Sequence, residues 1–319
     1  MHAQTPSVSV VVSTYDESRW QNLFACIESL QRQTVPAAQL IVVVDHNPAL
    51  LERARTAFPD ATVIANDRPR GLAGARNAGI AASSSEVVAF IDDDARAEPD
   101  WLGVLGSCFG AVETVGAGGA LIPDWEDGKP AWVPTEFYWV FGCSYTGLPE
   151  QLAPVRNPIG ANMAARTAVL NAVGGFREGG EKDSPRELRA RGMVRAAGNV
   201  PDDTDLAIRV KQRITDAVWL YQPAARVLHS VPAARASLGY FLRRSFEEGV
   251  GKASLSRFVG TEAGLSSERS YVTRVLPRGV LRELGSLIRG DGAALLRILT
   301  IVAGTGAAAA GYVSVLVRR

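Results

Sequence analysis

The sequence predicts an α/β protein built on a mostly parallel, twisted sheet flanked by helices. The chain has 319 residues, of which 47% are hydrophobic and 21% charged, so it can bury a large core. Short, almost continuously apolar runs alternate with amphipathic stretches from Ser7 to about Ile122. Such runs are typical of parallel strands covered on both faces, and a helix between two of them indicates a βαβ unit.

Four runs are expected to be strands: Ser7–Ser13, Leu40–Val44, Thr62–Ala65 and Val87–Ile91. Between the first two, Ser18–Gln33 is expected to be a helix, because its apolar residues recur on one face. Ser18 and Gln21 stand in capping-box spacing at its start. Ligands of such sheets bind at the carboxyl ends of the strands, so the chemistry is expected there.

After Ile122 the pattern changes, and residues 123–160 are irregular and rich in aromatic side chains. Residues 177–200 are polar and glycine-bearing, which favours a loop that closes over a bound donor. A helix is expected over Asp202–Arg213 and a short strand over Ala217–Tyr221.

From about Ala233 the sequence predicts basic amphipathic helices, so we expect two parts: residues 1–232 as the α/β domain and 233–319 as a membrane-associated extension. Residues 298–317 carry no formal charge, and a helix of that length spans about 30 Å, enough to cross a bilayer. Arginines are more numerous before this segment than after it, which favours a catalytic part on the cytosolic side. The alternatives are basic helices lying on an anionic membrane surface, and an alanine-rich helix packed on the domain or on a second subunit.

The charge balance and the cysteines narrow the function classes. The net charge is +1, with 34 basic and 33 acidic residues, which argues against a surface made for nucleic acid. The three cysteines are widely spaced and have no metal-ligand spacing, so neither a disulfide framework nor structural zinc is expected. No basic segment followed by an apolar stretch opens the chain, so no signal peptide is expected and a cytoplasmic location is favoured.

Three adjacent carboxylates, Asp92, Asp93 and Asp94, follow the strand Val87–Ile91 directly. Because they repel one another, a positive partner is expected beside them. On an extended segment Asp92 and Asp94 point the same way, and their oxygens suit Mg²⁺ or Mn²⁺ bridged to phosphate. A solvated turn in which Asp94 caps a helix is the alternative.

Two weaker signals come earlier in the chain. Asp45 ends the strand Leu40–Val44, and a glycine-bearing turn over 66–79 leads into a helix. The amides of that helix start, together with Arg76, could meet an anion. Asp45 capping a turn and Arg76 lying on a solvated face are the alternatives.

Together and in this order, these segments resemble the family 2 glycosyltransferases, and the resemblance covers roughly Ser7 to Lys252. The stretches that carry it are VVSTYDE, VVVDHN, GLAGARNAGI, FIDDDA, GANMAARTAVLNAVGGF, PDDTDLAIRV and the histidine of ARVLHS. It implies a GT-A fold, a nucleotide-sugar donor and inversion at the anomeric carbon. Within the family, VVVDHNPAL, FIDDDARAEPDW and PDWEDGKPAWVPTEFYWVFG resemble the glucosyl-dolichyl-phosphate glucuronosyltransferase type.

The resemblance implies a role for each matching residue. The residues implied in nucleotide-sugar binding are Thr14, Tyr15, Glu17, Asp45, Arg76, Asp92, Asp93, Arg243 and Arg244. Asp94, Asp92 and His229 are implied as ligands of Mn²⁺ or Mg²⁺, which would neutralise the charge that grows on the leaving diphosphate. The alternatives are a structural histidine at position 229 and a membrane-facing helix for the two arginines.

The catalytic base is expected in PDDTDL. The family usually has Glu-Asp where this chain has Asp202 and Asp203, and the second position implies Asp203 as the base for an acceptor hydroxyl. The shorter Asp202 departs from that pattern. The alternative is an acidic first turn that suits the dipole of the following helix.

The acceptor side is expected near the aromatic stretch, where Trp125 and Trp139 offer flat apolar faces to a sugar, and near Asn162. The subfamily resemblance and the C-terminus favour a lipid-linked or otherwise glycosylated acceptor and a UDP-linked donor, with glucuronate as the transferred sugar. The rival activities are a polyprenyl-phosphate sugar synthase and a non-catalytic sugar-nucleotide or glycan-binding module. A glycosidase would need no metal-binding triplet, so the acidic triplet argues against that activity.

Overall fold

A computed structural model describes residues 6–178, 201–259 and 268–317, which fall into two compact units. The sheet unit comprises the described residues up to Ile122, 149–178 and 202–229. The helical unit comprises 123–148 and the described residues from Ser230 onward. The expected loop at 177–200 lies outside the described residues except for its first two positions.

The sheet has two kinds of strand pairing. The parallel strands are β1 (Val8–Thr14), β2 (Gln39–Val44), β3 (Thr62–Ala65) and β4 (Val87–Asp92), the four that the sequence predicts. The other strands are β5 (Ala95–Ala97), β6 (Thr114–Trp125), β7 (Ala153–Val155), β8 (Asn162–Arg166) and β9 (Val218–Val231). The order is β3-β2-β1-β4-β8-β6-β9-β5, with β7 also paired to β9, and β8 joins β4 antiparallel. The sheet is therefore mixed, with its parallel half at the N-terminal end of the chain.

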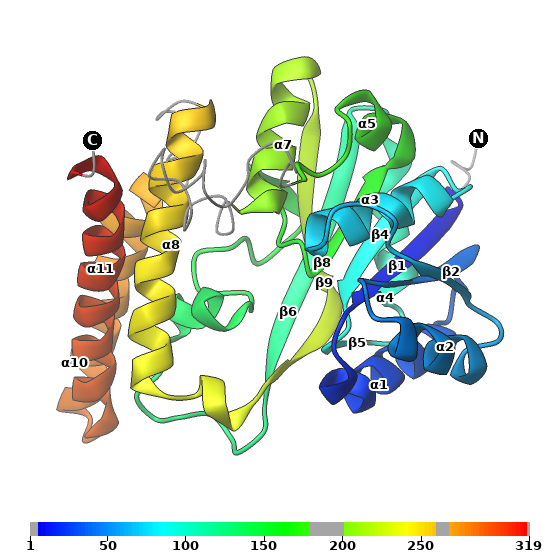
Figure 1. The fold of residues 1–319 in the computed structure, drawn as a ribbon. Coiled ribbons are helices and arrows are strands. Elements are labelled where there is room, and N and C mark those ends of the chain that lie inside the picture. Colours follow the sequence, from blue (N-terminus) through cyan, green and yellow to red (C-terminus); the bar gives the residue numbers. More distant parts are fainter. Residues whose placement is uncertain (1–5, 179–200, 260–267, 318–319) are drawn as a thin grey trace. The chain divides into compact units, whose positions relative to one another are not determined.

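Helices cover the sheet as the βαβ pattern predicts (Figure 1). Their bounds are α1 (Trp20–Gln31), α2 (Pro48–Ala57), α3 (Leu72–Ala82), α4 (Trp101–Gly106), α5 (Thr167–Ala172) and α7 (Asp202–Arg213). Helix α3 lies close to β1 because Gly79 has no side chain: a Cβ there would stand 2.4 Å from a methyl group of Val11. The helix expected over Asp202–Arg213 is confirmed as α7.

The predicted capping box before α1 is wrong. The carboxylate of Asp16 accepts a hydrogen bond from the Ser18 amide at 2.9 Å and opens a short 3₁₀ turn, Glu17–Arg19. Helix α1 then begins at Trp20 with no side-chain cap. Asp16 thus binds the Ser18 amide at the start of this turn, and the chain enters α1 through the turn and without a capping box. The turn also sets the position of Arg19.

Asn162 connects three strands of the sheet. Its amide group donates to the carbonyls of Ala120 on β6 and Ala225 on β9, at 3.1 and 2.9 Å. Its carbonyl accepts from the indole N–H of Trp101 at 2.8 Å. The side chain is fully buried, so these three bonds join β6, β8 and β9 to helix α4. Asn162 thus has a structural role in this fold, and its expected place beside the acceptor stays a prediction.

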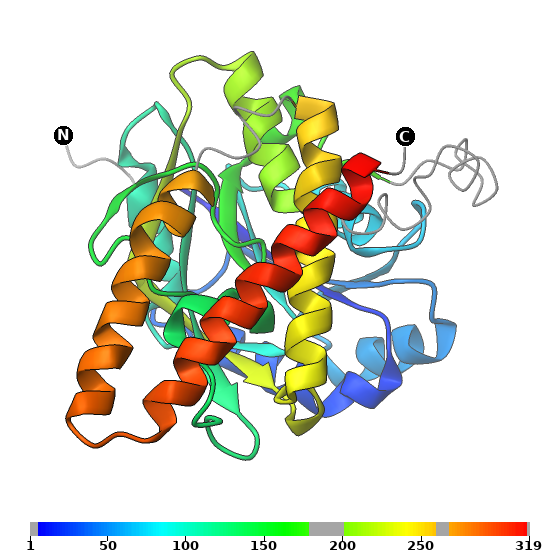
Figure 2. The ribbon, with the colours of Figure 1, turned by 90° about the vertical axis from the view of Figure 1, so that its left-hand side faces the viewer.

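The helical unit contains α8 (Leu238–Val259), a π-helical turn (Tyr271–Val275), α10 (Leu276–Ile288) and α11 (Ala293–Val317). Figure 2 shows α11 crossing α8 along much of its length. The aromatic segment 123–148, which the sequence assigns to the first part of the chain, packs in this unit: Phe137 and Trp132 both contact Phe241 of α8. Among the described residues, α11 is long and apolar enough to cross a membrane.

Replacing Asn162 by alanine is expected to lower the free energy of unfolding by about 3 kcal/mol, because two buried carbonyls and the Trp101 N–H lose their partner. Chemical denaturation followed by fluorescence measures the change. The matched control is Asn171→Ala at an exposed position of α5, which should alter stability by less than about 0.5 kcal/mol. Equal effects of the two substitutions would contradict the role assigned to Asn162.

Candidate active site

The sheet topology brings Asp94 and His229 together. Asp92 is the last residue of β4, and Asp93 and Asp94 connect it to β5. Strand β5 pairs antiparallel with β9, which places Ala95 opposite His229. The His229 Nε2 atom lies 3.3 Å from an Asp94 oxygen, and ligand atoms of Asp92, Asp94 and His229 lie within 4.8 Å of one another.

Arg19 supplies the positive partner that three crowded carboxylates require. Its guanidinium lies 2.6 Å from Asp93 and 2.5 Å from Asp94. Burial raises the pKa of Asp93 to about 7, with repulsion from its acidic neighbours adding to the rise and Arg19 opposing it. Sequence reasoning expected a cation here but did not identify Arg19.

Arg76 connects Asp92, at the end of β4, to Asp202, at the start of α7. One of its nitrogens lies 3.1 Å from Asp92 and another 2.9 Å from Asp202, while the side chain is only 3% exposed. Burial alone would lower the pKa of Arg76, but Asp202 and Asp92 outweigh burial and raise it, so the guanidinium is charged. The side chain therefore holds two carboxylates from distant parts of the chain in one place.

Asp203 is fixed by backbone amides. One of its oxygens accepts from the Gly160 amide at 3.0 Å, and the other accepts from the Thr204 amide at 2.6 Å in the first turn of α7. Gly160 lies between Asp203 and Arg76: a Cβ there would stand 2.9 Å from an Arg76 nitrogen. Any other residue there would require the guanidinium to shift, so Gly160 belongs to the site although it has no side chain.

The third acid of PDDTDL has a structural role. Asp205 is 1% exposed and pairs with Arg209 at 2.7 Å and with Arg177 at 3.1 Å. Arg209 in turn donates to the carbonyls of Val173 and Gly175. The pair thus attaches α7 to the turn after α5, and this support keeps Asp202 and Asp203 at the site.

Asp45 organises the turn before α3. Its Oδ1 accepts from Asn66 at 2.6 Å and lies 2.7 Å from a ring nitrogen of His46, and its Oδ2 accepts from the Gly71 amide at 2.9 Å. Thr14 is buried, and its backbone carbonyl accepts a hydrogen bond from the Asp45 amide. These contacts hold the loop over 66–71 against the ends of β1 and β2.

Tyr15 and Glu17 follow β1 and are exposed, so both side chains are available to a ligand at this edge of the sheet. The Tyr15 ring is 56% exposed and stands 5.7 Å from the Arg19 guanidinium. Their expected roles in holding the nucleotide stay predictions.

Four further residues implied by the resemblance lie in the helical unit. Arg243 and Arg244 pair with acids one turn later on α8, Glu247 at 4.0 Å and Glu248 at 3.4 Å. Trp125 packs edge-on against Phe141, and the Trp139 indole donates to the Tyr271 hydroxyl at 3.0 Å. Both tryptophans remain partly exposed. Their roles toward diphosphate and acceptor stay predictions.

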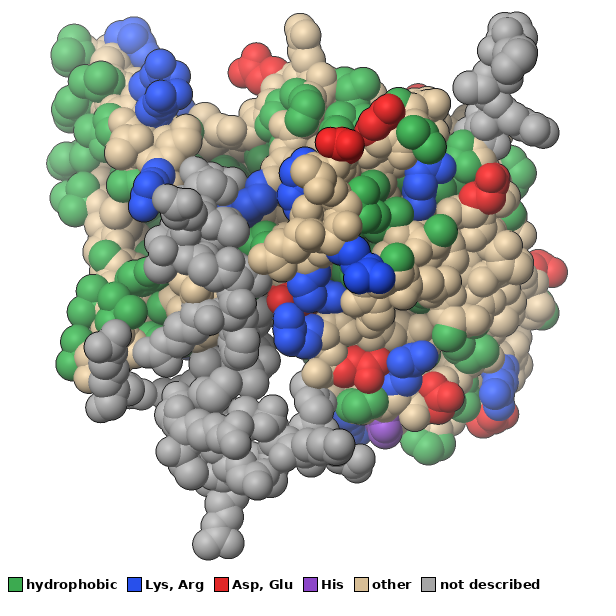
Figure 3. All heavy atoms as spheres, turned by 90° about the horizontal axis from the view of Figure 1, so that it is seen from above, with side chains coloured by type: hydrophobic (Ala, Val, Ile, Leu, Met, Phe, Trp, Pro, Cys, Tyr) green, Lys and Arg blue, Asp and Glu red, His purple; other side chains and the backbone are tan. Residues whose placement is uncertain are grey.

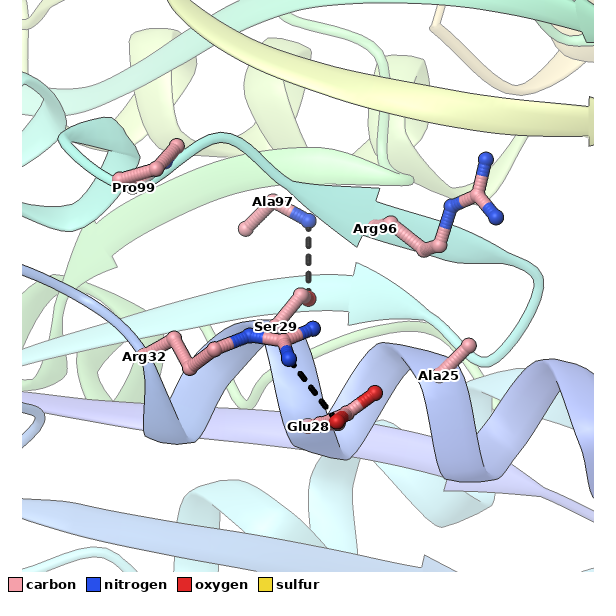
Figure 4. A pocket seen from close by; sticks show the side chains of 7 residues that line it. All are labelled: Ala25, Glu28, Ser29, Arg32, Arg96, Ala97 and Pro99. Atoms are coloured by element: carbon pink, nitrogen blue, oxygen red, sulfur yellow. Dashed lines mark hydrogen bonds and ion pairs between the residues drawn. The ribbon is translucent and has the colours of Figure 1, made fainter.

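A separate cavity of about 500 Å³ lies between α1 and β5 (Figure 4). Arg32 and Arg96 line it with Glu28 and Ser29, but Arg32 already pairs with Glu28 at 2.8 Å. The Ser29 hydroxyl accepts from the Ala97 amide at 3.0 Å. None of the expected site residues lines this cavity, so it does not carry the candidate chemistry.

The three clustered side chains fit a divalent cation. Two carboxylates and one imidazole are donors that Mn²⁺ accepts, and Mg²⁺ accepts the carboxylates. The turn at Asp93 and Asp94, between β4 and β5, brings Asp92 and Asp94 to His229, so that the three side chains could bind one ion. Arg19 is the competing cation at Asp94.

Comparisons with known proteins show which family the chain resembles. Residues 9–174 match the family described as glycosyl transferase family 2. The chain is 30% identical over 311 residues to glucosyl-dolichyl phosphate glucuronosyltransferase of Haloferax volcanii, covering 96% of this chain and 95% of that protein. It is 34% identical over 102 residues to the putative glycosyltransferase EpsH of Bacillus subtilis, covering 31% of this chain and 29% of that one.

A solved structure has the same fold. The mannosyltransferase PcManGT from Pyrobaculum calidifontis, in complex with GDP-Man and Mn²⁺, superimposes with a TM-score of 0.58 at 16% identity. The match covers 97% of this chain and 88% of that one, so it shows the fold, which is GT-A. The family match and the full-length similarity to a curated member identify the chain as a member of glycosyl transferase family 2.

Proposed function

We propose that the protein transfers a sugar from a UDP-linked donor to a hydroxyl of a lipid-linked or otherwise glycosylated acceptor, with inversion at the anomeric carbon. The observation that carries the proposal is the meeting of Asp92, Asp94 and His229 with Asp202 and Asp203 around the buried Arg76. Glucuronate is the proposed sugar, on the strength of the full-length similarity to the Haloferax volcanii glucuronosyltransferase.

The nucleotide is proposed to lie at the ends of β1 and β2. There Tyr15 and Glu17 are exposed after β1, and the buried Asp45 accepts from the Gly71 amide in the turn that leads into α3. Arg76 would orient the ribose and diphosphate side through Asp92. A bound Mn²⁺ or Mg²⁺, held by Asp92, Asp94 and His229, would stabilise negative charge on the departing diphosphate.

Asp203 is proposed as the base that takes the proton of the acceptor hydroxyl as that oxygen attacks. The support is its position at the start of α7, where Oδ2 accepts from the Gly160 amide and Oδ1 accepts from the amide and the hydroxyl of Thr204, so the carboxylate is fixed in place. Arg76 binds Asp202 directly, so Asp202 is proposed to position Arg76 and the start of α7. In this arrangement the base and the metal ligands are joined through a single guanidinium.

A lipid-linked acceptor implies that the protein works at a membrane, and we propose the cytoplasmic face. The support is the apolar helix α11 and the arginines before it, which the anionic lipids of a cytoplasmic leaflet would attract. The partly exposed Trp125 and Trp139 are proposed to contact the acceptor, and Arg243 and Arg244 to approach the diphosphate.

Replacing Asp94 by asparagine is expected to abolish metal-dependent release of nucleoside diphosphate, because a neutral amide is a far weaker ligand of a divalent cation. Purified protein is incubated with a panel of nucleotide sugars, with and without Mn²⁺, and the released diphosphate is measured. The unchanged protein should hydrolyse one UDP-sugar slowly, and only with metal. Asp60→Asn, at an exposed position after α2, is the control and should behave like the unchanged protein. Turnover by Asp94→Asn at the normal rate would overturn the metal assignment.

Replacing Asp203 by asparagine is expected to lower turnover on a hydroxyl acceptor by about 10²- to 10⁴-fold, because the base is lost. Donor affinity, measured by calorimetry, should stay within about threefold, because Asp203 is proposed to act on the acceptor and not to bind the donor. Asp216→Asn, exposed before β9, is the control. Near-normal turnover by Asp203→Asn would favour a phosphate acceptor, which needs no base.

Replacing Arg19 by glutamine is expected to lower the melting temperature in the presence of a chelator, because two buried carboxylates lose their cation. Added Mn²⁺ should then raise the melting temperature by more than it does in the unchanged protein, since the ion no longer competes with a guanidinium. Differential scanning calorimetry measures both shifts. The control Arg32→Gln removes an exposed ion pair on α1 and should change neither. An equal Mn²⁺ shift in Arg19→Gln and the unchanged protein would refute the competition.

A further inference from the structure

Helices α10 and α11 expose a continuous apolar surface within the helical unit. On α11 the exposed side chains include Leu295, Leu299, Val302 and Val313, and the helix has no charged residue after Arg297. Figure 3 shows hydrophobic side chains gathered along the edge that carries this helix. On α10, Leu281, Leu284 and Ile288 are exposed on one face, with Ile288 at 87%. A surface of this kind marks an interaction site.

The other face of α11 is closely attached to α8. A Cβ at Gly249 of α8 would stand 1.9 Å from the Ala308 carbonyl, and one at Gly311 of α11 would stand 2.0 Å from the Phe246 carbonyl. Gly304 similarly lies against Phe137 and Phe241. Because the backbones touch through glycines, α11 and α8 form one packed pair along the middle of both helices.

Helix α8 carries charges at the same level as the apolar middle of α11. Arg243, Arg244, Glu247, Glu248 and Lys252 lie on either side of the contacts at Phe246 and Gly249. Arg243 is 66% exposed and Glu247 40%. If α11 crossed a bilayer, its packed partner would bring these charges into the hydrocarbon, where charged side chains are strongly disfavoured. The packing therefore argues against a spanning α11.

The start of α11 is also tied down on its inner side. Arg297 lies 2.6 Å from Glu283 of α10 and 2.5 Å from Asp291. Glu283 also pairs with Arg282, which reaches the fully buried Glu136 at 2.8 Å. This ion-pair cluster fixes α10 against α11 and leaves both apolar faces outward.

Exposed arginines border the apolar face of α10. Arg278 precedes Leu281 by three residues, so the two lie on neighbouring positions of α10, Arg289 follows Ile288, and Arg274 is exposed on the π-helical turn before α10. An apolar stripe edged by arginines suits an anionic lipid surface: the apolar side chains enter the acyl region while the guanidinium groups meet headgroup phosphates.

We propose that α10 and α11 lie in the plane of one leaflet, as a surface that binds anionic lipid, and that α11 does not cross the membrane. The proposal rests on the membrane association proposed above and is independent of the transfer reaction. It places the chain before α10 and the end of α11 on the same side of the bilayer.

Flotation of the full chain with phosphatidylcholine vesicles, with and without phosphatidylglycerol, tests the surface. The unchanged protein should float at least about tenfold more with the anionic vesicles, and the double variant Ile288→Asp/Leu299→Asp should lose that binding by a similar factor. Val112→Asp, at an 81% exposed apolar position of the sheet unit, is the matched control and should float normally. Flotation of the double variant at the normal level would overturn the proposal. So would a change from dimer to monomer in that variant with flotation unchanged, since the face would then bind a second copy of the chain.

A labelling experiment in cell membranes separates lying from crossing. A cysteine appended after Arg319 and a second one at Val112→Cys are exposed to a membrane-impermeant maleimide in inside-out and right-side-out vesicles; the native cysteines are buried. Both new cysteines should react from the same side. Reaction of the appended cysteine from the opposite side alone would overturn the proposal. Donor hydrolysis measured on the same samples reports on the transfer reaction separately, because neither cysteine lies among its residues.

Discussion

The structure depends on holding five carboxylates close together at the carboxyl end of β4. Asp92 ends β4, Asp93 and Asp94 follow it in the turn to β5, and Asp202 and Asp203 begin α7. Left alone, these groups would repel one another and would be costly to bury. Two arginines from distant segments, Arg19 and Arg76, counter this repulsion. The order of the strands in the sheet brings these acids and arginines close together.

The fold could be predicted where side-chain patterns are strong. The β-branched runs of β1 to β4 predict parallel strands correctly, and the acidic start of α7 predicts that helix to the residue. Strands β6 and β8 escaped prediction because they are rich in glycine and alanine, which show no clear alternation. The glycines of β6 are required by contacts, such as the Trp219 ring against Gly116, that involve residues far along the chain.

The acidic residues of the site could be predicted from the sequence, but most of the residues that hold them in place could not. The triplet after β4 is visible as a sequence feature, and it implies a cation of unknown identity. Arg19 lies on a short turn with no periodicity, and nothing local distinguishes it from Arg32, which is merely paired on the surface. The sequence also assigns no role to Asp205, the third acid of PDDTDL, whereas its contacts with Arg177 and Arg209 make it a structural support of α7.

Gly160 contacts both Asp203 and Arg76, although it has no side chain. Its amide holds Asp203, and its missing side chain leaves space for Arg76. A side chain there would require the guanidinium to shift away from Asp92 and Asp202. One substitution at this position would therefore alter the surroundings of carboxylates from two distant segments, although neither acid itself is changed.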